Sequence, residues 1–231
     1  LVQHDFLSVA RPGVRLHGVA LSIVRVGVND IHFTELQDPG RAISADNRPL
    51  IASTEQSADY ALYLSGARRF GKRLAIGLSA KAIYRQVASV NAYGFGVDLG
   101  ARYQLSPGIA LAANLRDITT TPIIWNTDST DRIQPSLLLG LAYALPLAGG
   151  QTTFIVGSRS GGDSTDTADK APLNAGLEYH HYYITLRAGL EESRQSLGLG
   201  LKPHAKLDLD LAYLQHNELR ATYQLSANFR F

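Results

Sequence analysis

The chain has 231 residues, of which 45% are hydrophobic and 18% charged, and its formal net charge is +2. An apolar content this high excludes a disordered chain. The absence of cysteine excludes disulfides, thiolate catalysis and cysteine-ligated metal centres. Because no basic stripe accompanies the small net charge, nucleic-acid binding has no electrostatic basis. The sequence also contains no Met, so we expect that a leader and further chain precede Leu1.

Apolar and polar residues alternate with a period of two along most of the chain. In the run from Leu219 to Phe231, every second residue is apolar and each residue between them is polar. Alternation of this kind places one apolar and one polar face on a β-strand. The pattern predicts thirteen strands, in chain order at 2–10, 14–30, 58–70, 72–88, 92–105, 108–118, 134–146, 151–159, 172–181, 182–192, 195–203, 205–216 and 218–231.

The connections between these runs alternate between tight turns and longer polar segments. The longer set includes 31–57, 119–133 and 160–171. Short turns on one rim and long loops on the other are typical of an outer-membrane barrel. A soluble antiparallel sandwich is the alternative, but its strands are usually about 5–6 residues long, whereas most of these runs are longer. The sequence therefore predicts an all-β fold, a transmembrane antiparallel β-barrel forming a single domain over 1–231.

The number of strands follows from parity. Bacterial barrels of one chain have an even number of strands with both ends in the periplasm. We therefore expect one strand before Leu1, giving about fourteen in all; a wrongly divided run would give about twelve instead. Tyr93 and Tyr103 lie ten residues apart on one apolar face, which corresponds to roughly 25 Å along the membrane normal, the height of the apolar band. We expect this pair to lie in the two aromatic girdles.

Charged side chains fall on the polar, lumen-facing phase of several predicted strands. Unpaired buried charges are unfavourable, so we expect these groups to pair with one another and to hold the shape of the barrel; a transport pathway is the alternative. Gly94, Gly96 and Gly100 share the same phase, where their lack of a side chain leaves room for bulky inward groups. The charged residues are Lys81, Arg85, Asp98, Arg102, Arg116, Glu178, Arg187, Asp208 and Asp210.

Other groups of potentially reactive residues carry weaker signals. His180 and His181 are adjacent and would point to opposite faces of a strand, so we expect a rim position rather than a metal site. A loop with three aspartates lacks the spacing of a calcium-binding loop, and a serine hydrolase would have to draw on a loose group near the outer rim. We therefore predict no enzyme activity, no metal and no cofactor. The aspartates are Asp163, Asp166 and Asp169, and the loose group is His216, Asn217 and Ser226.

Two further features concern the second strand and the segment after it. The alternation changes phase near Val24, which predicts a β-bulge there. The segment 31–57 contains Leu50 and Ile51 and is long enough to have a function. Folding over the barrel mouth, contact with a partner and disorder remain open for it.

Short motifs along the whole chain carry a family resemblance. Their order and spacing resemble the PorV/PorQ-type outer-membrane proteins, a family within the FadL-like superfamily of fourteen-stranded barrels. The N-terminal plug segment typical of that family does not occur in this sequence. The motifs are Asp59 to Arg68, Leu78 to Lys81, Gly94 to Gly100, Asn114-Leu115, Gly176 to Tyr179, Leu186 to Gly189 and Phe229 to Phe231.

The resemblance implies a location in the bacterial outer membrane and one of two alternative functions. The first is an accessory role in type IX-like protein secretion, or in a larger outer-membrane assembly with protein partners. The second is FadL-like transport of hydrophobic small molecules. The apolar C-terminal residues Tyr223, Phe229 and Phe231 resemble the signal read by the barrel-assembly machinery. Outer-membrane lipid is the expected surrounding of the barrel in either case.

Overall fold

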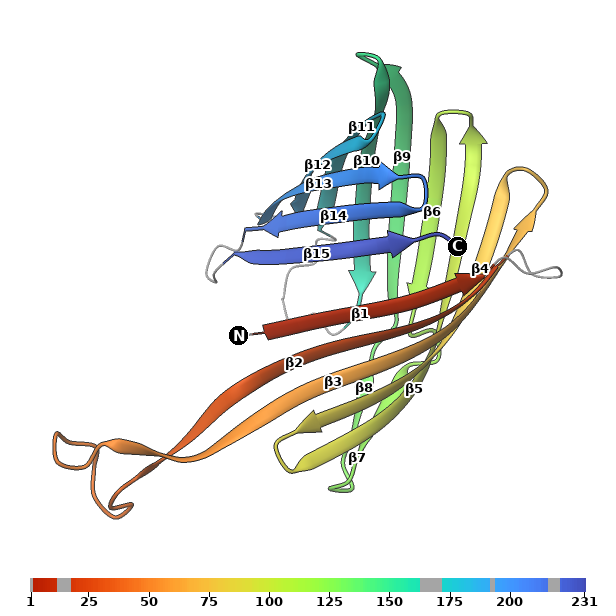
Figure 1. Ribbon diagram of the computed structural model, residues 1–231. Helices are drawn as coiled ribbons and strands as arrows, with labels where there is room; N and C mark the ends of the chain where they lie inside the picture. The colour runs from red at the N-terminus through yellow and green to blue at the C-terminus, as the bar shows by residue number, and fades with distance from the viewer. Residues whose placement is uncertain (1, 12–17, 163–171, 192–193, 216–220) are drawn as a thin grey trace. The chain divides into compact units, whose positions relative to one another are not determined.

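The computed structural model is an all-β structure of fifteen strands (Figure 1). It describes residues 2–11, 18–162, 172–191, 194–215 and 221–231. Within this part of the chain, no helix is long and apolar enough to cross a bilayer. The strands are β1 (Val2–Arg11), β2 (Gly18–Leu36), β3 (Pro49–Phe70), β4 (Leu74–Val87), β5 (Val90–Ser106), β6 (Ile109–Arg116), β7 (Thr121–Trp125), β8 (Thr130–Ile133), β9 (Ser136–Leu147), β10 (Gly150–Gly161), β11 (Leu173–His181), β12 (Ile184–Glu191), β13 (Arg194–His204), β14 (Leu207–Leu214) and β15 (Thr222–Phe229).

The strands form one sheet in which sequence neighbours are generally sheet neighbours. The main path runs from β1 through β6 and then from β9 to β15, while β7 pairs with β5 and β8 pairs with β7. Every pairing with a resolved register is antiparallel, as in β9 with β10 and β14 with β15. Each of the thirteen predicted strands is present, and the prediction of an antiparallel all-β fold is confirmed.

The chain divides into two compact units. The first comprises Leu1–Arg68, Gly77–Leu99 and Asp117–Pro135, and the second comprises Arg69–Ile76, Gly100–Arg116 and Ser136–Phe231. Each ion pair among the described residues lies within one of these units.

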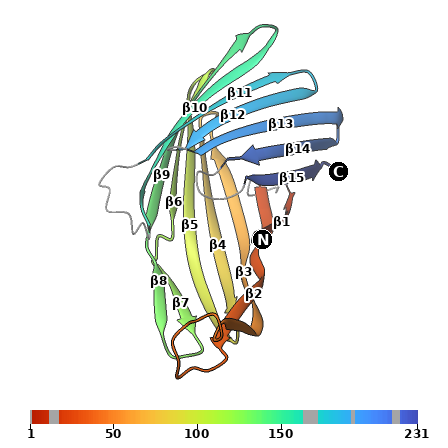
Figure 2. The same ribbon diagram turned by 90° about the vertical axis from the view of Figure 1, so that its left-hand side faces the viewer.

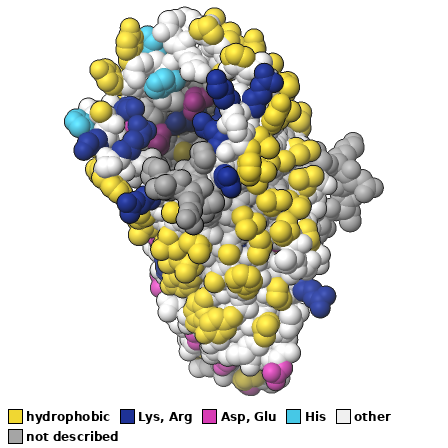
Figure 3. Space-filling view, turned by 90° about the vertical axis from the view of Figure 1, so that its right-hand side faces the viewer, with side chains coloured by type: hydrophobic (Ala, Val, Ile, Leu, Met, Phe, Trp, Pro, Cys, Tyr) yellow, Lys and Arg dark blue, Asp and Glu magenta, His cyan; other side chains and the backbone are white. Residues whose placement is uncertain are grey.

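Large apolar side chains lie on the outer surface of the sheet instead of in an interior core. On β9, the side chains of Leu139, Leu141 and Tyr143 are exposed and alternate with less exposed neighbours. Among the described residues, the only buried hydrophobic side chains are Ala92, Ala110 and Ile123. Figure 3 shows hydrophobic side chains gathered over this surface. We call the face that carries these exposed apolar residues the outer face and the opposite one the inner face.

Cross-strand register keeps the two faces separate. Leu7 pairs with Ile23 and Ile23 pairs with Leu62, so three apolar side chains stand side by side on the outer face. One step along, Ser8 and Ser22 pair on the inner face and their hydroxyls are 2.7 Å apart. Directly opposed residues share a face, so the period of two in the sequence becomes an apolar and a polar surface.

The segment 31–57 is largely strand, contrary to the loop predicted there. β2 and β3 remain paired from Ile31 with Glu55 out to Leu36 with Pro49. The register shifts between Val28 and Ile31, whereas pairing is regular through Val24, so the predicted position of the bulge is wrong. Polar residues occupy both faces of this extension, which removes the alternation on which the sequence analysis relied.

A second hairpin lies in the segment 119–133, which was also predicted to be a loop. β7 pairs with β5 through Ile123 with Gly94, and β8 pairs with β7 through Ile123 with Asp131 (Figure 2). The backbone takes positive φ at Asp117 (54°) and Thr120 (53°) between β6 and β7. After this kink, the chain continues as β7, which pairs with residues 92–94 of β5.

Candidate functional site

A buried ion cluster on the inner face supports the kink between β6 and β7. Lys81 on β4 is 5% exposed, and its Nζ lies 2.8 Å from Asp98 on β5 and 2.7 Å from Asp117. Asp98 also accepts a hydrogen bond from the backbone N of Asp117 at 2.8 Å. The hydroxyl group of Thr121 donates a hydrogen bond to the Asp117 carboxylate. The Lys81 ammonium group thus links β4 and β5 to the turn in which the chain changes direction between β6 and β7.

Two glycines on β5 provide the space for this cluster. A Cβ at Gly94 would collide with the Ile123 side chain and lie 2.8 Å from the carbonyl oxygen of Pro122. A Cβ at Gly96 would collide with Thr121 and lie 2.7 Å from Cε of Lys81. The prediction that these glycines make room for inward groups is confirmed at both positions. No comparable crowding exists at Gly100, where the nearest atom lies 4.0 Å away.

A second ion pair lies farther along the inner face of the same unit. Arg85 donates to both carboxylate oxygens of Asp59, at 3.1 and 3.0 Å. Its guanidinium carbon also lies 6.0 Å from the centre of the Trp125 ring, and the indole N–H donates to Asp131 at 2.7 Å. Paired hydrogen bonds and an aromatic contact fix the guanidinium plane. The β7–β8 hairpin is thereby tied to β3 and β4.

The second unit contains a three-strand ion network. Arg187 on β12 donates to Glu178 on β11 at 2.7 Å and to Asp210 on β14 at 2.6 Å. Its guanidinium reaches past β13 because Gly200 has no side chain there: a Cβ would lie 3.2 Å from the Arg187 Nη1 atom. Asp208, two residues before Asp210, pairs with Arg230 at 2.5 Å.

The structure brings seven of the nine predicted lumen charges into ion pairs, and their partners were only partly foreseen. Arg102 donates to the side chain of Gln104 at 3.3 Å, and within the described part of the chain no ion pair of Arg116 is found. Three of the partners are not among the charges selected from the sequence: one lies on a neighbouring strand, one directly follows β15, which neighbours β14, and one lies beside the kink. These are Asp59, Asp117 and Arg230.

The histidine pair has no metal-binding geometry. His180 Nδ1 lies 2.9 Å from the hydroxyl of Thr185, while the ring of His181 stacks on Tyr179 and meets Tyr182 edge-on. Over the residues that the structure describes, no group of three or more metal-ligating side chains is close enough to hold an ion. The aspartates of the 160–171 loop (Asp163, Asp166 and Asp169) and the pair His216 and Asn217 lie outside the described residues, whereas Ser226 lies within β15.

The C-terminal residues of the predicted assembly signal lie at the end of the sheet. Tyr223 pairs with Tyr213, and the two ring centres are 5.4 Å apart. Tyr223, Phe229 and Phe231 are all exposed. They form an apolar stripe on β15 and the residues after it.

The extended part of the β2–β3 hairpin is a second candidate site. We call residues 31–55 the arm; it projects from the rest of β2 and β3 in Figure 1. The described pairing of β1 with β2 ends at Val28, and the β4–β5 turn reaches only Gln56, whose carbonyl accepts from the backbone N of Ala88. The arm is therefore two-stranded, and it carries four exposed apolar side chains: Phe33, Ile43, Leu50 and Ile51.

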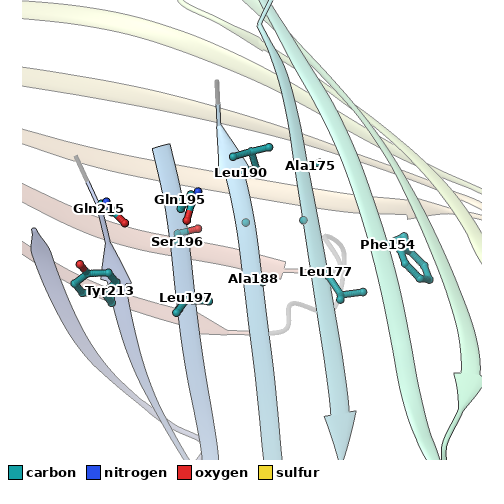
Figure 4. A pocket seen from close by; sticks show the side chains of 12 residues that line it. Phe154, Ala175, Leu177, Ala188, Leu190, Gln195, Ser196, Leu197, Tyr213 and Gln215 are labelled. Carbon is teal, nitrogen blue, oxygen red and sulfur yellow. The ribbon is translucent and has the colours of Figure 1, made fainter. Parts of the chain in front are cut away.

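A shallow apolar groove of about 490 Å³ crosses the outer face of the second unit (Figure 4). The small side chains Ala175 and Ala188 form its floor, and Leu177 and Leu197 lie beside them. Gln195 and Gln215 supply amide groups in the lining. The chemistry of the lining suits an alkyl chain with a polar group at one point.

Comparison with known proteins identifies no family. No family model and no curated protein matches the chain. Among solved structures, a mutant of the Rh. blastica porin aligns over 100% of both chains at 11% sequence identity, with a TM-score of 0.44.

Proposed function

We propose that the chain is a membrane-spanning β-barrel of an outer membrane. The observation that carries this proposal is the difference between the two faces: exposed Leu, Phe and Tyr side chains cover most of one face, while the described ion pairs other than Asp5–Arg25 lie on the opposite face. Lipid satisfies such an outer face, and backbone hydrogen bonds within the sheet satisfy every interior strand. Bacterial barrels of this kind reside in the outer membrane.

The absence of cysteine makes this proposal directly testable. Single cysteines placed at Leu139 and Leu141, on the outer face, and at Gly140, on the inner face, are labelled with a membrane-impermeant maleimide after refolding into vesicles. We expect slow labelling at Leu139→Cys and Leu141→Cys, because lipid covers them. The protein unfolded in urea without detergent gives the reference for complete labelling at all three positions. Rapid labelling of both outer positions in intact vesicles contradicts the proposal.

Within this frame, we propose an accessory role of the PorV/PorQ type, in secretion or in a larger assembly with protein partners. The arm supports this role, since a polar two-stranded projection with exposed apolar side chains is suited to contact another protein. The inner face supports it as well. Its charges neutralise one another across strands, which is typical of a barrel held rigid rather than one lined for passage.

A photo-crosslinking residue at Phe33 tests the arm as the contact. The expected result is a crosslink to one large membrane protein in native membranes, lost when Ile43, Leu50 and Ile51 are changed to serine. The same crosslinker at Leu139 serves as the matched control on the outer face. Equal crosslinking from both positions, or none from the arm, contradicts the accessory role.

The groove on the outer face favours a second candidate, FadL-like movement of hydrophobic small molecules. Its apolar lining, with the small side chains Ala175 and Ala188 between larger ones, suits contact with a lipophile from the membrane plane. Changing Ala188 to Trp fills the groove. If the barrel carries lipophiles, the protein purified gently from native membranes contains such molecules, and Ala188→Trp reduces their amount; an unchanged amount argues for the accessory role.

A further inference from the structure

A row of polar aromatic side chains and one arginine crosses the outer face of the first unit. Asp5, Arg25 and Tyr60 are directly opposed on β1, β2 and β3. The Tyr60 ring lies 6.1 Å from that of Tyr84 on β4, and Tyr84 lies 5.1 Å from Tyr93 on β5. Five neighbouring strands thus contribute one side chain each at one level.

The register places this row on the outer face. Leu7, Ile23 and Leu62 form the next apolar row on that face, and each lies two residues from a member of the polar row. Residues two apart on a strand share a face. Tyr93 is 63% exposed and shares its phase with the exposed Phe95. The row therefore borders the apolar surface.

The row also marks where the apolar surface gives way to the arm. Toward the short turns, exposed leucines, isoleucines and valines continue on β1 to β4. Toward the arm, the outer face meets Gln3 and Gly27, and then the register shift after Val28. Tyrosine at such a boundary keeps its ring in the apolar layer and its hydroxyl in the polar layer.

The arginine side chain points away from the apolar surface. The Nη2 atom of Arg25 lies 3.0 Å from the position that a Cβ would take at Gly27, and Nη1 lies 3.5 Å from the side-chain oxygen of Gln3. Both residues lie on the arm side of Arg25. The Nε atom of Arg25 donates a hydrogen bond to the Tyr60 hydroxyl at 3.3 Å. The guanidinium carbon of Arg25 lies 5.9 Å from the centre of the Tyr60 ring, so the aliphatic part of the arginine side chain lies at the level of the row. This is the geometry of a cation that extends toward a headgroup layer.

We propose that Arg25, with the hydroxyls of Tyr60 and Tyr84, binds the phosphate group of a membrane lipid at the arm-side boundary of the apolar surface. The ligand is a phosphate ester that carries acyl chains, which lie along the leucine and valine rows below. A planar guanidinium presents paired donors that match phosphate oxygens, and the adjacent phenols supply further donors. This proposal rests on the proposed location of the outer face in a bilayer.

Asp5 provides the sharpest test because it competes for the same guanidinium. Its carboxylate accepts from Arg25 Nη1 at 3.1 Å, and its side chain is 68% exposed. In a purely structural pair, loss of either partner weakens the same interaction. In a phosphate site, loss of Asp5 frees donors and removes a repelling charge, whereas loss of Arg25 removes the site. The two variants then act in opposite directions.

The experiment measures lipids retained by the refolded chain in native mass spectrometry, after incorporation into vesicles of phosphatidylglycerol or of a phosphate-free galactosyl diacylglycerol. We expect retention of phosphatidylglycerol, a roughly tenfold decrease in Arg25→Gln, as for loss of one charge-assisted interaction, and an increase in Asp5→Asn. Arg25→Lys keeps the charge and retains part of the binding. Arg132→Gln on β8 is the matched control and leaves retention unchanged.

Four outcomes overturn the proposal. They are equal retention of both lipids, no effect of Arg25→Gln, a decrease in Asp5→Asn equal to that in Arg25→Gln, and full displacement of the lipid by millimolar inorganic phosphate, which would indicate a free-anion site. Cysteine labelling at Leu139 on the same samples reports insertion independently. Failure of insertion therefore refutes the membrane location, whereas insertion without selective retention refutes only the phosphate site.

Discussion

At the scale of single residues, charged groups on the inner face act as cross-links between strands. Lys81 has two carboxylate partners and almost no solvent exposure. Arg187 spans three strands by passing over a glycine. Both arrangements require a long cation, a short acid and a missing side chain at fixed places, so each can be broken at a single position.

Removal of the Lys81 ammonium is expected to destabilise the first unit strongly. Lys81→Ala leaves Asp98 and Asp117 close together without a counter-charge, and loss of one partner of a buried pair typically costs about 3–5 kcal/mol. The free energy of unfolding from urea titrations in micelles measures this effect. Lys206→Ala, at an exposed turn position, is the control, with an expected change within about 0.5 kcal/mol. Equal effects of the two substitutions would refute the role assigned to Lys81.

A methyl group at Gly200 is expected to disturb the Arg187 network. The new Cβ would lie 2.8 Å from the Asp210 carboxylate and 3.1 Å from the Cβ of Thr185. Crowding of this kind costs typically about 1–3 kcal/mol. Gly140→Ala is the matched control, since its Cβ would meet only a carbonyl oxygen at 3.9 Å. The same urea titration compares the two, and a Gly200→Ala variant as stable as Gly140→Ala would show that the network adapts freely.

At the scale of elements, two hairpins depart from the plain meander, and each depends on a few polar contacts. The β7–β8 hairpin is attached through the Lys81 cluster and the Trp125 indole. In the arm, the loop between β2 and β3 is organised by Asn47, which is 1% exposed. Its amide donates to the carbonyl oxygens of Asp38, Arg41 and Ala42.

Loss of the Asn47 amide is expected to loosen the arm without affecting the rest of the sheet. Asn47→Ala removes three donated hydrogen bonds and the acceptor for the backbone N of Asp38 at 2.9 Å. Arg41 and Arg48 lie in this loop, so limited trypsin digestion reports its opening directly. We expect cleavage roughly tenfold faster than in the parent protein, in line with the loss of about 1–2 kcal/mol of local stability. Asp46→Ala is the control; equal rates in both variants would show that Asn47 does not hold the loop.

Strands with two chemically different faces could be predicted from the sequence, whereas strands whose two faces meet the same surroundings could not. β9 to β15 alternate clearly and were located to within a few residues. The arm has polar residues on both faces, so its sequence shows no alternation and predicts a loop. β7 contains Pro122 and the consecutive apolar residues Ile123 and Ile124, which hide a period of two.

The same distinction explains the result for the candidate site. The inward charges could be identified from the alternation of residues along each strand, since the face on which a residue lies depends only on its own strand. Partner identity depends on which strands become neighbours and on their register. Asp59 reaches Arg85 from a different strand, and Asp117 reaches Lys81 only because of a backbone kink. Neither relation is present in any short window of sequence.

At the scale of the whole chain, exposed apolar side chains outweigh buried ones, and this determines its behaviour in solution. Nearly every strand exposes large hydrophobic residues, while buried hydrophobics among the described residues number only three. Without detergent or lipid we expect aggregation, because contiguous apolar surface of this extent associates. In mild detergent we expect a folded species that migrates differently in unboiled and boiled samples on a denaturing gel. A monodisperse detergent-free monomer in size-exclusion chromatography would contradict this expectation.

The order of the sheet also bears on how proteins of this kind can change size. Apart from the β7–β8 insertion, each strand is bonded to the strands that precede and follow it in the chain. A hairpin can therefore be duplicated or deleted as one continuous segment of a gene without rethreading any other strand. Each such event changes the number of strands by two and leaves the direction of the remaining strands unchanged. In this architecture, a change in the width of the sheet requires only the copying of a short stretch of coding sequence, whereas a change between an even and an odd number of strands requires a new connection.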